Sequence, residues 1–239
     1  MQSNRILGMI CYVHVVRYPK YLGFFGMLSM AFFRISLFLN KHVHFYKLLG
    51  CGKNGSFDLQ PDWRQWAILT ISDNQQNRLN HITPFIQWWW QFFKCELLWL
   101  KLQPIEGHGT WDRQLCFGKL PLKTNYEGPI AILTRATIHT KKIKQFWSHV
   151  DAVSAEMHRA PGLITSIGIG EIPWFRGATL SVWESKTHMR AFAYSQPFHQ
   201  AVIVKTRKEK WYSEDMFVRF IPIEVSGTLR GIDPFNGKL

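Results

Sequence analysis

The stretch IAILTRATI (Ile130–Ile138) opens the part of the sequence that decides the fold. Its β-branched and apolar residues predict a strand. Lys141–His158 follows, with Ile143, Phe146, Trp147 and Val150 at helical spacing, so it predicts an amphipathic helix. The dipeptide Pro161-Gly162 ends that helix. The second half of the chain therefore begins with a strand followed by a helix.

The remaining segments of both halves continue this pattern into β-α-β-β-α-β order. In the second half we expect strands at Leu163–Ile169, Ala178–Trp183 and Met216–Ile223, with a helical stretch over Ser185–Lys208 that breaks at Pro197. In the first half we expect strands at Arg5–Val16, Phe45–Leu49, Trp66–Ser72 and Cys95–Leu102, and helices at Leu22–Leu39 and at Asn74–Phe93, bent near Pro84.

Two such ferredoxin-like halves have a natural arrangement. Each antiparallel sheet has helices on one face only, so its other face must be covered. Packing the two bare faces together predicts an α+β fold, a pseudo-twofold barrel of tandem ferredoxin-like halves. We place the N-terminal half at residues 1–105, a Pro- and Gly-rich linker at 106–127, and the C-terminal half at 128–239.

Composition narrows the classes of partner. The 239 residues carry 29 Lys and Arg against 16 Asp and Glu, a net charge of +13 that favours polyanions. No zinc-finger spacing, RNP-like strand or phosphate loop accompanies this charge, so we expect no nucleic acid and favour an anionic membrane surface. The four cysteines are far apart and predict free thiols in a reducing compartment. We find no convincing secretory signal, and expect a cytoplasmic protein.

The segment Leu22–Leu39 is apolar apart from Arg34 and leaves three interpretations open. By length it is a marginal transmembrane candidate. It also fits a helix buried against a sheet. A third possibility is a helix that dips into one leaflet while Arg17, Lys20, Arg34 and Lys41 meet the headgroups.

His199 differs from the other nine histidines, which lie near segment ends, in loops or on polar helix faces. Ser195 is a good N-cap for a helix that restarts after the break, and Pro197 is tolerated in its first turn. His199 then shares a face with Val202 and Ile203. A histidine on an apolar face is either a hydrogen-bonded core residue or a ligand to a metal or haem iron. His188 is the next candidate.

Several long motifs carry a family resemblance. They are FYKLLGCGKNGSF (Phe45–Phe57) followed by WAILTIS, IGIGEIPWFRGATLSVWES (Ile167–Ser185), FAYSQPFHQAV (Phe192–Val202) and EKWYSEDMFVRF (Glu209–Phe220). In this order and spacing, which cover most of the chain, they resemble the spheroidene monooxygenases, carotenoid ketolases of photosynthetic bacteria.

The resemblance implies a haem-dependent monooxygenase that inserts oxygen into an apolar polyene, with repeated hydroxylation leading to a ketone. It implies haem b as cofactor, dioxygen as oxidant and an external electron donor such as a ferredoxin. Haem enzymes of the same two-half barrel take a proximal histidine from a C-terminal helix, which assigns the iron to His199. Haem propionates need cations, and we expect these among Arg135, Arg176 and Arg219. No residue is assigned to the catalytic chemistry itself.

The aromatic content of 15% suits a channel for an apolar rod, with Trp88–Trp90 and the Leu22 helix as candidates for its wall and entrance. We therefore expect a carotenoid-like substrate and peripheral contact with the inner membrane. Two alternatives stay open: another haem enzyme of this fold, a dehydratase or a peroxidase-like enzyme acting on a small molecule, and a haem- or lipid-binding module without turnover. The sequence leaves the oligomeric state open.

Overall fold

The computed structural model describes residues 8–53, 60–73, 81–172, 174–195, 204–206 and 208–238. In the first half these form β1 (Met9–Arg17), α2 (Gly23–Phe38), β2 (Phe45–Gly52), β3 (Pro61–Asp73), α3 (Pro84–Phe92) and β4 (Glu96–Gly109). In the second half they form β5 (Ile130–Ile138), the short helix η1 (Thr140–Lys142), α4 (Ile143–His158), β6 (Leu163–Ile172), β7 (Arg176–Trp183), α5 (Lys186–Ser195) and β8 (Tyr212–Gly227). The doubled β-α-β-β-α-β order is confirmed.

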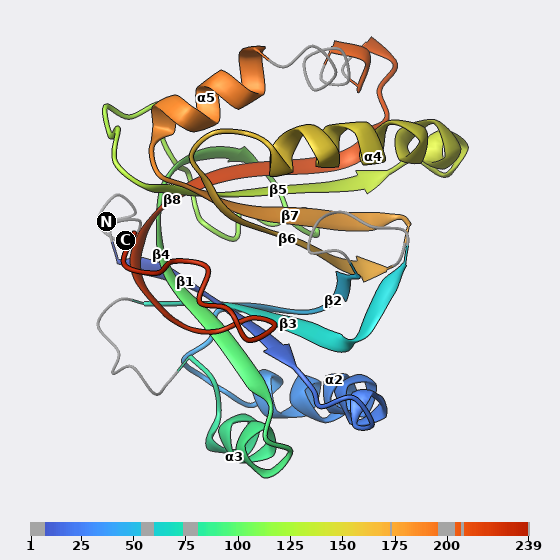
Figure 1. Cartoon of the computed structure of the whole chain (residues 1–239), viewed down its shortest axis with the longest axis vertical. Helices are drawn as coiled ribbons and strands as arrows, with labels where there is room; N and C mark the ends of the chain where they lie inside the picture. The colour runs from blue at the N-terminus through green and yellow to red at the C-terminus, as the bar shows by residue number, and fades with distance from the viewer. Residues whose placement is uncertain are drawn as a thin grey trace.

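The strands close into one antiparallel barrel in the order β1-β3-β2-β6-β7-β5-β8-β4. Helices α2 and α3 lie outside one half of the barrel, and α4 and α5 lie outside the other (Figure 1). The two seams between the halves differ in length. β4 and β8 pair from Leu98↔Gly227 to Gly109↔Met216, whereas the described residues of β2 and β6 pair at two positions, Gly50↔Gly170 and Cys51↔Ile169. The predicted α+β barrel is therefore confirmed, with one long seam and one short one.

The barrel interior holds the largest apolar cluster. Alternate residues of each strand point inward, for example Ala131 and Leu133 on β5 and Met216 and Val218 on β8. Cys51 also faces this interior, where burial raises the pKa of its thiol to about 12. All four cysteines are free thiols, as predicted.

The segment that connects the halves differs from the expected linker. β4 continues to Gly109, and the pairing with β8 tolerates irregularities after Lys101 and after Pro104. Gly107 keeps the strand close to β8, because a Cβ there would lie 2.5 Å from the carbonyl oxygen of Phe217. The connection then returns and buries two aromatic rings, those of Trp111 and Phe117, in the barrel interior. The division of the chain at residues 105 and 128 stays a prediction.

Helix α2 has 16 residues, about one turn fewer than the roughly 20 that a membrane-spanning helix needs. Phe33 and Leu37 are buried against the N-terminal sheet, while Phe24, Ile35 and Phe38 are exposed. Within the described ranges, no helix combines the length and the apolar character required to cross a membrane. One face of α2 is thus part of the core, and the opposite face is apolar and open.

Candidate functional site

The outer face of the C-terminal sheet, beneath α4 and α5, is the candidate site. Since Ala131 and Leu133 point into the barrel, Ile132, Thr134 and Ala136 of β5 point outward. Thr134 is exposed although β5 lies between β7 and β8 in the barrel. The helices therefore leave the middle of this face incompletely covered (Figure 1).

This face is a platform of small side chains, and strand register brings them into rows. Gly168 pairs with Thr179, which pairs with Thr134. On the side toward α5, the neighbouring row consists of Ser166, Ser181 and Ile132. On the opposite side, the neighbouring row consists of Gly170, Gly177 and Ala136. From strand spacing and rise, three strands and three rows make a flat area of roughly 10 by 13 Å. We call this surface the platform.

Aromatic residues of the two helices border the platform. At the α5 side, Phe192 stacks on Trp183 with ring centroids 5.3 Å apart. At the α4 side, Trp147 donates a hydrogen bond from Nε1 to the carbonyl oxygen of Trp174, 3.1 Å away. A flat apolar group lying on the platform would therefore have aromatic rings at its edges.

A buried ion cluster lies beside the row that contains Ile132. Arg219 of β8 pairs with Ile132, and its guanidinium donates to Glu106. The same carboxylate accepts from Nζ of Lys186 at 3.0 Å and from the backbone nitrogen and hydroxyl of Thr124 at 2.6 and 2.8 Å. The side chains of Glu106 and Lys186 are both 0% exposed. Although burial opposes ionisation, the hydrogen bonds from Lys186, Thr124 and Arg219 lower the pKa of Glu106 to about 2.

Two buried polar atoms at this face have no partner among the described residues: the hydroxyl of Ser166 and Nε of Arg219. Buried polar groups are normally hydrogen-bonded. The small side chains, the exposed Thr134 and these two atoms fit a planar, largely apolar group with polar substituents at its rim. The platform thus fits a haem-like cofactor.

The other two arginines expected near a cofactor lie elsewhere. Arg135 points to the inside of the barrel end, where Nη1 lies 2.5 Å from Glu214 and Nη2 lies 3.5 Å from Glu171. Arg176 lies 3.6 Å from Asp112, a carboxylate that Lys47 also contacts. The structure brings Arg135 and Arg176 together but places Arg219 on the opposite face of the sheet. A role for each of them toward a propionate stays a prediction.

His199 lies outside the described residues, so its assignment to iron stays a prediction. His188, the alternative, is on α5, and its Nδ1 lies 3.1 Å from the hydroxyl of Ser185. In the part of the chain that the structure describes, no three His, Cys, Asp or Glu side chains are grouped so as to hold a metal ion.

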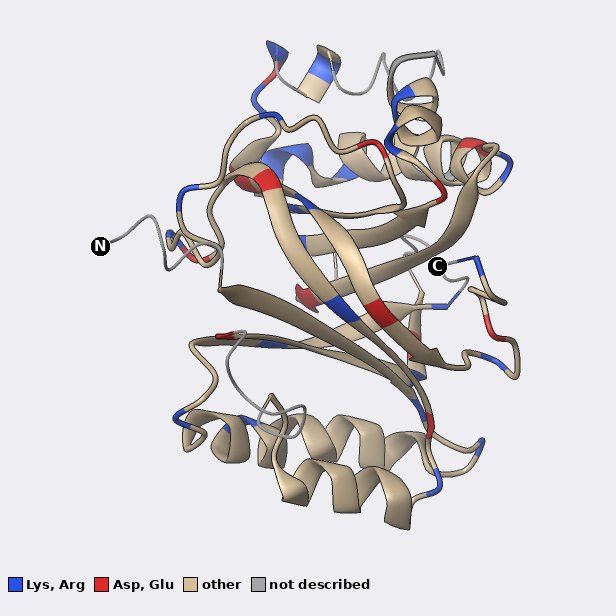
Figure 2. Cartoon of the chain, turned by 90° about the vertical axis from the view of Figure 1, so that its left-hand side faces the viewer, with Lys and Arg blue, Asp and Glu red and all other residues tan. Residues whose placement is uncertain are grey.

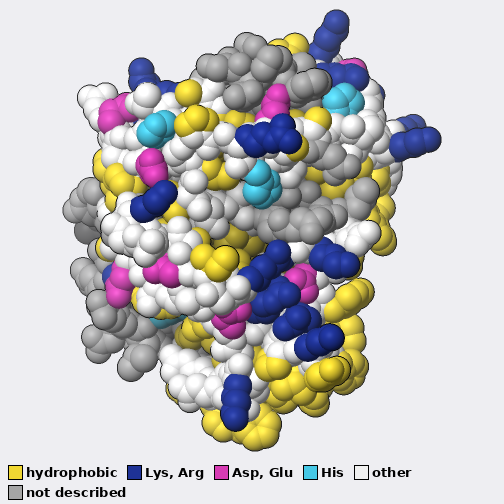
Figure 3. Space-filling model, in the orientation of Figure 1, with side chains coloured by type: hydrophobic (Ala, Val, Ile, Leu, Met, Phe, Trp, Pro, Cys, Tyr) yellow, Lys and Arg dark blue, Asp and Glu magenta, His cyan; other side chains and the backbone are white. Residues whose placement is uncertain are grey.

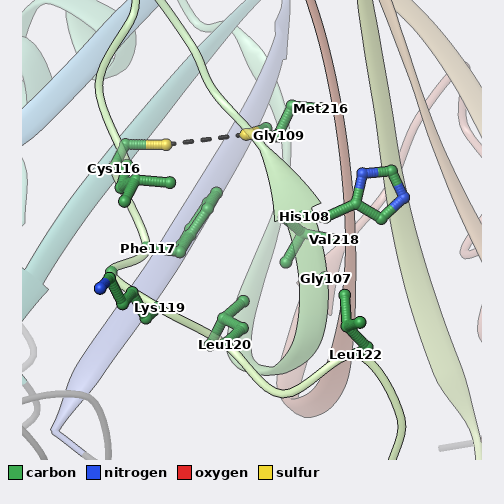
Figure 4. Close-up of a pocket in the computed structure, with 12 residues that line it drawn as sticks. Gly107, His108, Gly109, Cys116, Phe117, Lys119, Leu120, Leu122, Met216 and Val218 are labelled. Carbon is green, nitrogen blue, oxygen red and sulfur yellow. Dashed lines mark hydrogen bonds between the residues drawn. The ribbon is translucent and has the colours of Figure 1, made fainter.

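A cavity of about 320 Å³, separate from the platform, lies between the end of β4, the connecting segment and β8 (Figure 4). Its lining is mainly apolar, with the thiol of Cys116 lying 3.7 Å from the sulfur of Met216. Burial raises the pKa of that thiol to about 12, so it is not a nucleophile at neutral pH. His108 stacks with Phe217 on the outer side of β8. We find no acid–base pair in this cavity.

Sequence reasoning missed the Glu106 cluster and the aromatic border. Glu106 was assigned to a linker because prolines and glycines surround it. Its partner Lys186 lies 80 positions away along the chain, so no local spacing reveals the pair. In GIGEIPWFRG, the alternation of glycine with isoleucine is a signal for a strand with one face of small residues.

Comparisons with solved structures define the class of protein. An aldoxime dehydratase in complex with butyraldoxime superposes with a TM-score of 0.60 over 93% of this chain and 80% of that one, at 9% identity. A second aldoxime dehydratase gives a TM-score of 0.56 with 93% and 82% covered, also at 9% identity. At this identity the likeness concerns the fold alone, and it places this chain in the class of α+β barrel folds.

Curated relatives define the family. The spheroidene monooxygenase of Rhodobacter capsulatus is 35% identical over 201 residues, covering 82% of this chain and 83% of the relative. The spheroidene monooxygenase of Rubrivivax gelatinosus is 33% identical, covering 79% and 72%, and that of Cereibacter sphaeroides is 30% identical, covering 82% and 60%. No family model matches the chain. The chain belongs to the spheroidene monooxygenase family and is a monooxygenase.

Proposed function

We propose that this monooxygenase is haem-dependent and inserts oxygen into a carotenoid or a similar apolar polyene. The observation that carries the proposal is the 35% identity to a spheroidene monooxygenase across 82% of the chain. The reaction cleaves a C–H bond, places one atom of dioxygen on that carbon and reduces the other to water with two electrons from an external donor such as a ferredoxin. A second round at the same carbon gives a geminal diol, which loses water to form a ketone.

Haem, when bound, supplies the activation of dioxygen. We assign His199 as the ligand of its iron. We place Arg219 at the edge of its ring, because the Nε of this arginine is buried and has no partner among the described residues. Glu106 fixes the guanidinium of Arg219 from the other side. Arg135 faces Glu171 and Glu214, and its role toward a propionate stays a prediction beside that of Arg219.

A dehydratase of the same fold would need a group that can donate a proton near the platform. The buried carboxylate beside the platform is Glu106, and its pKa of about 2 keeps it ionised at neutral pH. It therefore acts as a fixed anion that orients Lys186 and Arg219, not as a general acid. The family membership favours the oxygenase over the dehydratase.

We also propose that the protein docks on the surface of an anionic membrane through the exposed face of α2 and α3. Figure 2 shows these helices almost without charged residues, and Figure 3 shows hydrophobic side chains gathered at this end of the molecule with Lys and Arg near their border. The exposed apolar residues are Phe24, Met27, Phe32, Ile35, Phe38, Phe85, Trp88 and Phe92. Lys20, Arg34, Lys41 and Lys94 are exposed near them. Such a surface suits a helix pair lying in the headgroup region, where an apolar substrate is available.

The function is tested with the purified protein, added haem, a reduced ferredoxin system and an acyclic carotenoid under isotopically heavy dioxygen. We expect the hydroxylated and ketone products to carry heavy oxygen, measured by mass spectrometry directly after a short incubation. A product that takes its oxygen only from water, or no oxygenated product from any polyene offered, would refute the proposal.

A further inference from the structure

A pocket of about 260 Å³ lies at the short seam between β2 and β6, where the described residues of the two halves share two pairs. Four tryptophans line it: Trp63 and Trp66 from the N-terminal half, and Trp147 and Trp174 from the C-terminal half. Five glycines from both sides of the seam also line it, namely Gly50, Gly52, Gly168, Gly170 and Gly177. We call it the tryptophan pocket.

Glycines and tryptophans in this arrangement suit a flat ligand. Strands without side chains let a planar molecule lie close to the backbone. Indole rings offer large apolar faces at a low cost in conformational entropy. A Cβ at Gly50 would lie in van der Waals contact, at 3.9 Å, with the carbonyl oxygen of Gly170 and the ring of Trp66, so a side chain there would occupy the pocket.

The polar residues in the lining are already paired. Asp62 lies 2.6 Å from Arg17, and Glu171 lies 2.6 Å from Lys47 and accepts a hydrogen bond from Trp111. Arg176, which also lines the pocket, lies 3.6 Å from Asp112. Because their charges are matched by other side chains, they do not call for a charged ligand. The pocket is thus suited to an apolar molecule.

The exposure of Trp174 supports a binding role for its ring. The residue is 51% exposed, so burial in the core does not account for a tryptophan here. Its φ of +68° is that of the third residue of a turn, which the backbone nitrogen of Phe175 closes by donating to the carbonyl oxygen of Ile172 at 3.3 Å. Glycine suits this backbone conformation as well as tryptophan does.

The pocket lies between α2 and the platform. On one side, Trp66 packs against Gly26 on the buried face of α2, where a Cβ would lie 2.3 Å from its Nε1. On the other side, Gly168, Gly170 and Gly177 belong both to this lining and to the platform. A ligand in the pocket therefore lies directly beside the platform.

We infer that the tryptophan pocket binds one segment of a long, planar, apolar molecule of the conjugated-polyene class and holds it beside the platform. The inference rests on the proposed function for the identity of the ligand, but the site itself is defined by its lining.

The test uses diphenylhexatriene, a fluorescent linear polyene, titrated into the full-length protein without haem, oxygen or reductant. Energy transfer from tryptophan and fluorescence anisotropy report binding. Gly50→Phe fills the pocket, and Trp174→Gly removes one indole and suits the positive φ. Ile223→Phe adds the same ring at an exposed position of β8 and is the matched control.

We expect Gly50→Phe and Trp174→Gly each to weaken binding by about tenfold or more, which corresponds to about 1.4 kcal/mol, and Ile223→Phe to leave it unchanged. Trp174→Gly should also unfold at a temperature no lower than the parent, whereas a merely structural tryptophan would lower it. Unchanged affinity in Trp174→Gly, or in a folded Gly50→Phe, would overturn the inference. A protein that binds the probe here but oxygenates no polyene would refute the proposed function and leave the site standing.

Discussion

Replacing Glu106 with glutamine removes a carboxylate shared by Lys186, Arg219 and Thr124. The contact of Glu106 with Lys186 is buried, since both side chains are 0% exposed, and those with Arg219 and Thr124 are partly buried. After the change, Lys186 keeps the carbonyl oxygen of Thr124 at 2.8 Å but loses its counter-charge. Breaking a buried pair by removing one partner costs about 3–5 kcal/mol. For a chain of this size that corresponds to a fall in Tm of roughly 6–20 °C.

The assay is urea and thermal unfolding at neutral pH, with Glu127→Gln as the matched control. Glu127 makes an exposed pair with Arg190 on the same helix as Lys186, at 3.3 Å, and its loss should cost no more than about 1 kcal/mol. Combining Glu106→Gln with Lys186→Met should recover part of the loss, because the uncompensated charge is then removed. A loss of unfolding free energy in Glu106→Gln as small as that in Glu127→Gln would refute the stabilising role of the cluster.

Two further predictions concern pH and membranes. His81 lies 3.2 Å from His14, and its burial lowers its pKa from 6.5 to about 4. As pH falls, this histidine therefore takes up a proton in the unfolded chain before it does so in the folded one. The free energy of unfolding should accordingly decrease between pH 6.5 and 4 by up to about 3 kcal/mol. His81→Phe should flatten this part of the profile in urea titrations, and an unchanged slope would contradict the assignment. With a net charge of +13, the protein should bind anionic vesicles in a salt-sensitive way, and Phe24→Ser with Phe38→Ser should weaken binding while the equally exposed Ile232→Ser does not. Equal partitioning to neutral and anionic vesicles at low salt would count against the membrane proposal.

Much of the fold could be predicted because local patterns repeat in both halves. Ile130–Ile138 is a strand with the predicted bounds, and α2 lies within the predicted Leu22–Leu39. The ends of β4 and β8 could not be predicted, since β4 continues through Pro104 and Gly107 only because β8 runs beside it. These boundaries depend on pairing between strands that are far apart in the sequence. Because proline and glycine are typical of loops, their presence here hides the strand from a local sequence pattern.

The site was less accessible to sequence reasoning, because it depends on register. Arg135 and Arg219 lie on neighbouring strands, and pairing of Arg219 with Ile132 puts the two arginines on opposite faces. A shift of one residue in the pairing of β5 with β8 would put both arginines on the same face. The sequence of neither strand alone determines this pairing. The small residues of the platform are likewise brought into rows only when β5, β6 and β7 pair.

The absorption spectrum of the haem-loaded protein tests the central claim, haem ligation by His199, most directly. The parent should show the Soret band of a histidine-ligated haem. His199→Ala should shift or abolish that band while circular dichroism shows a retained fold, and His188→Ala should keep the parent's spectrum. A His199→Ala variant with the spectrum and activity of the parent would contradict the claim, and a changed spectrum in His188→Ala alone would move the ligand to α5.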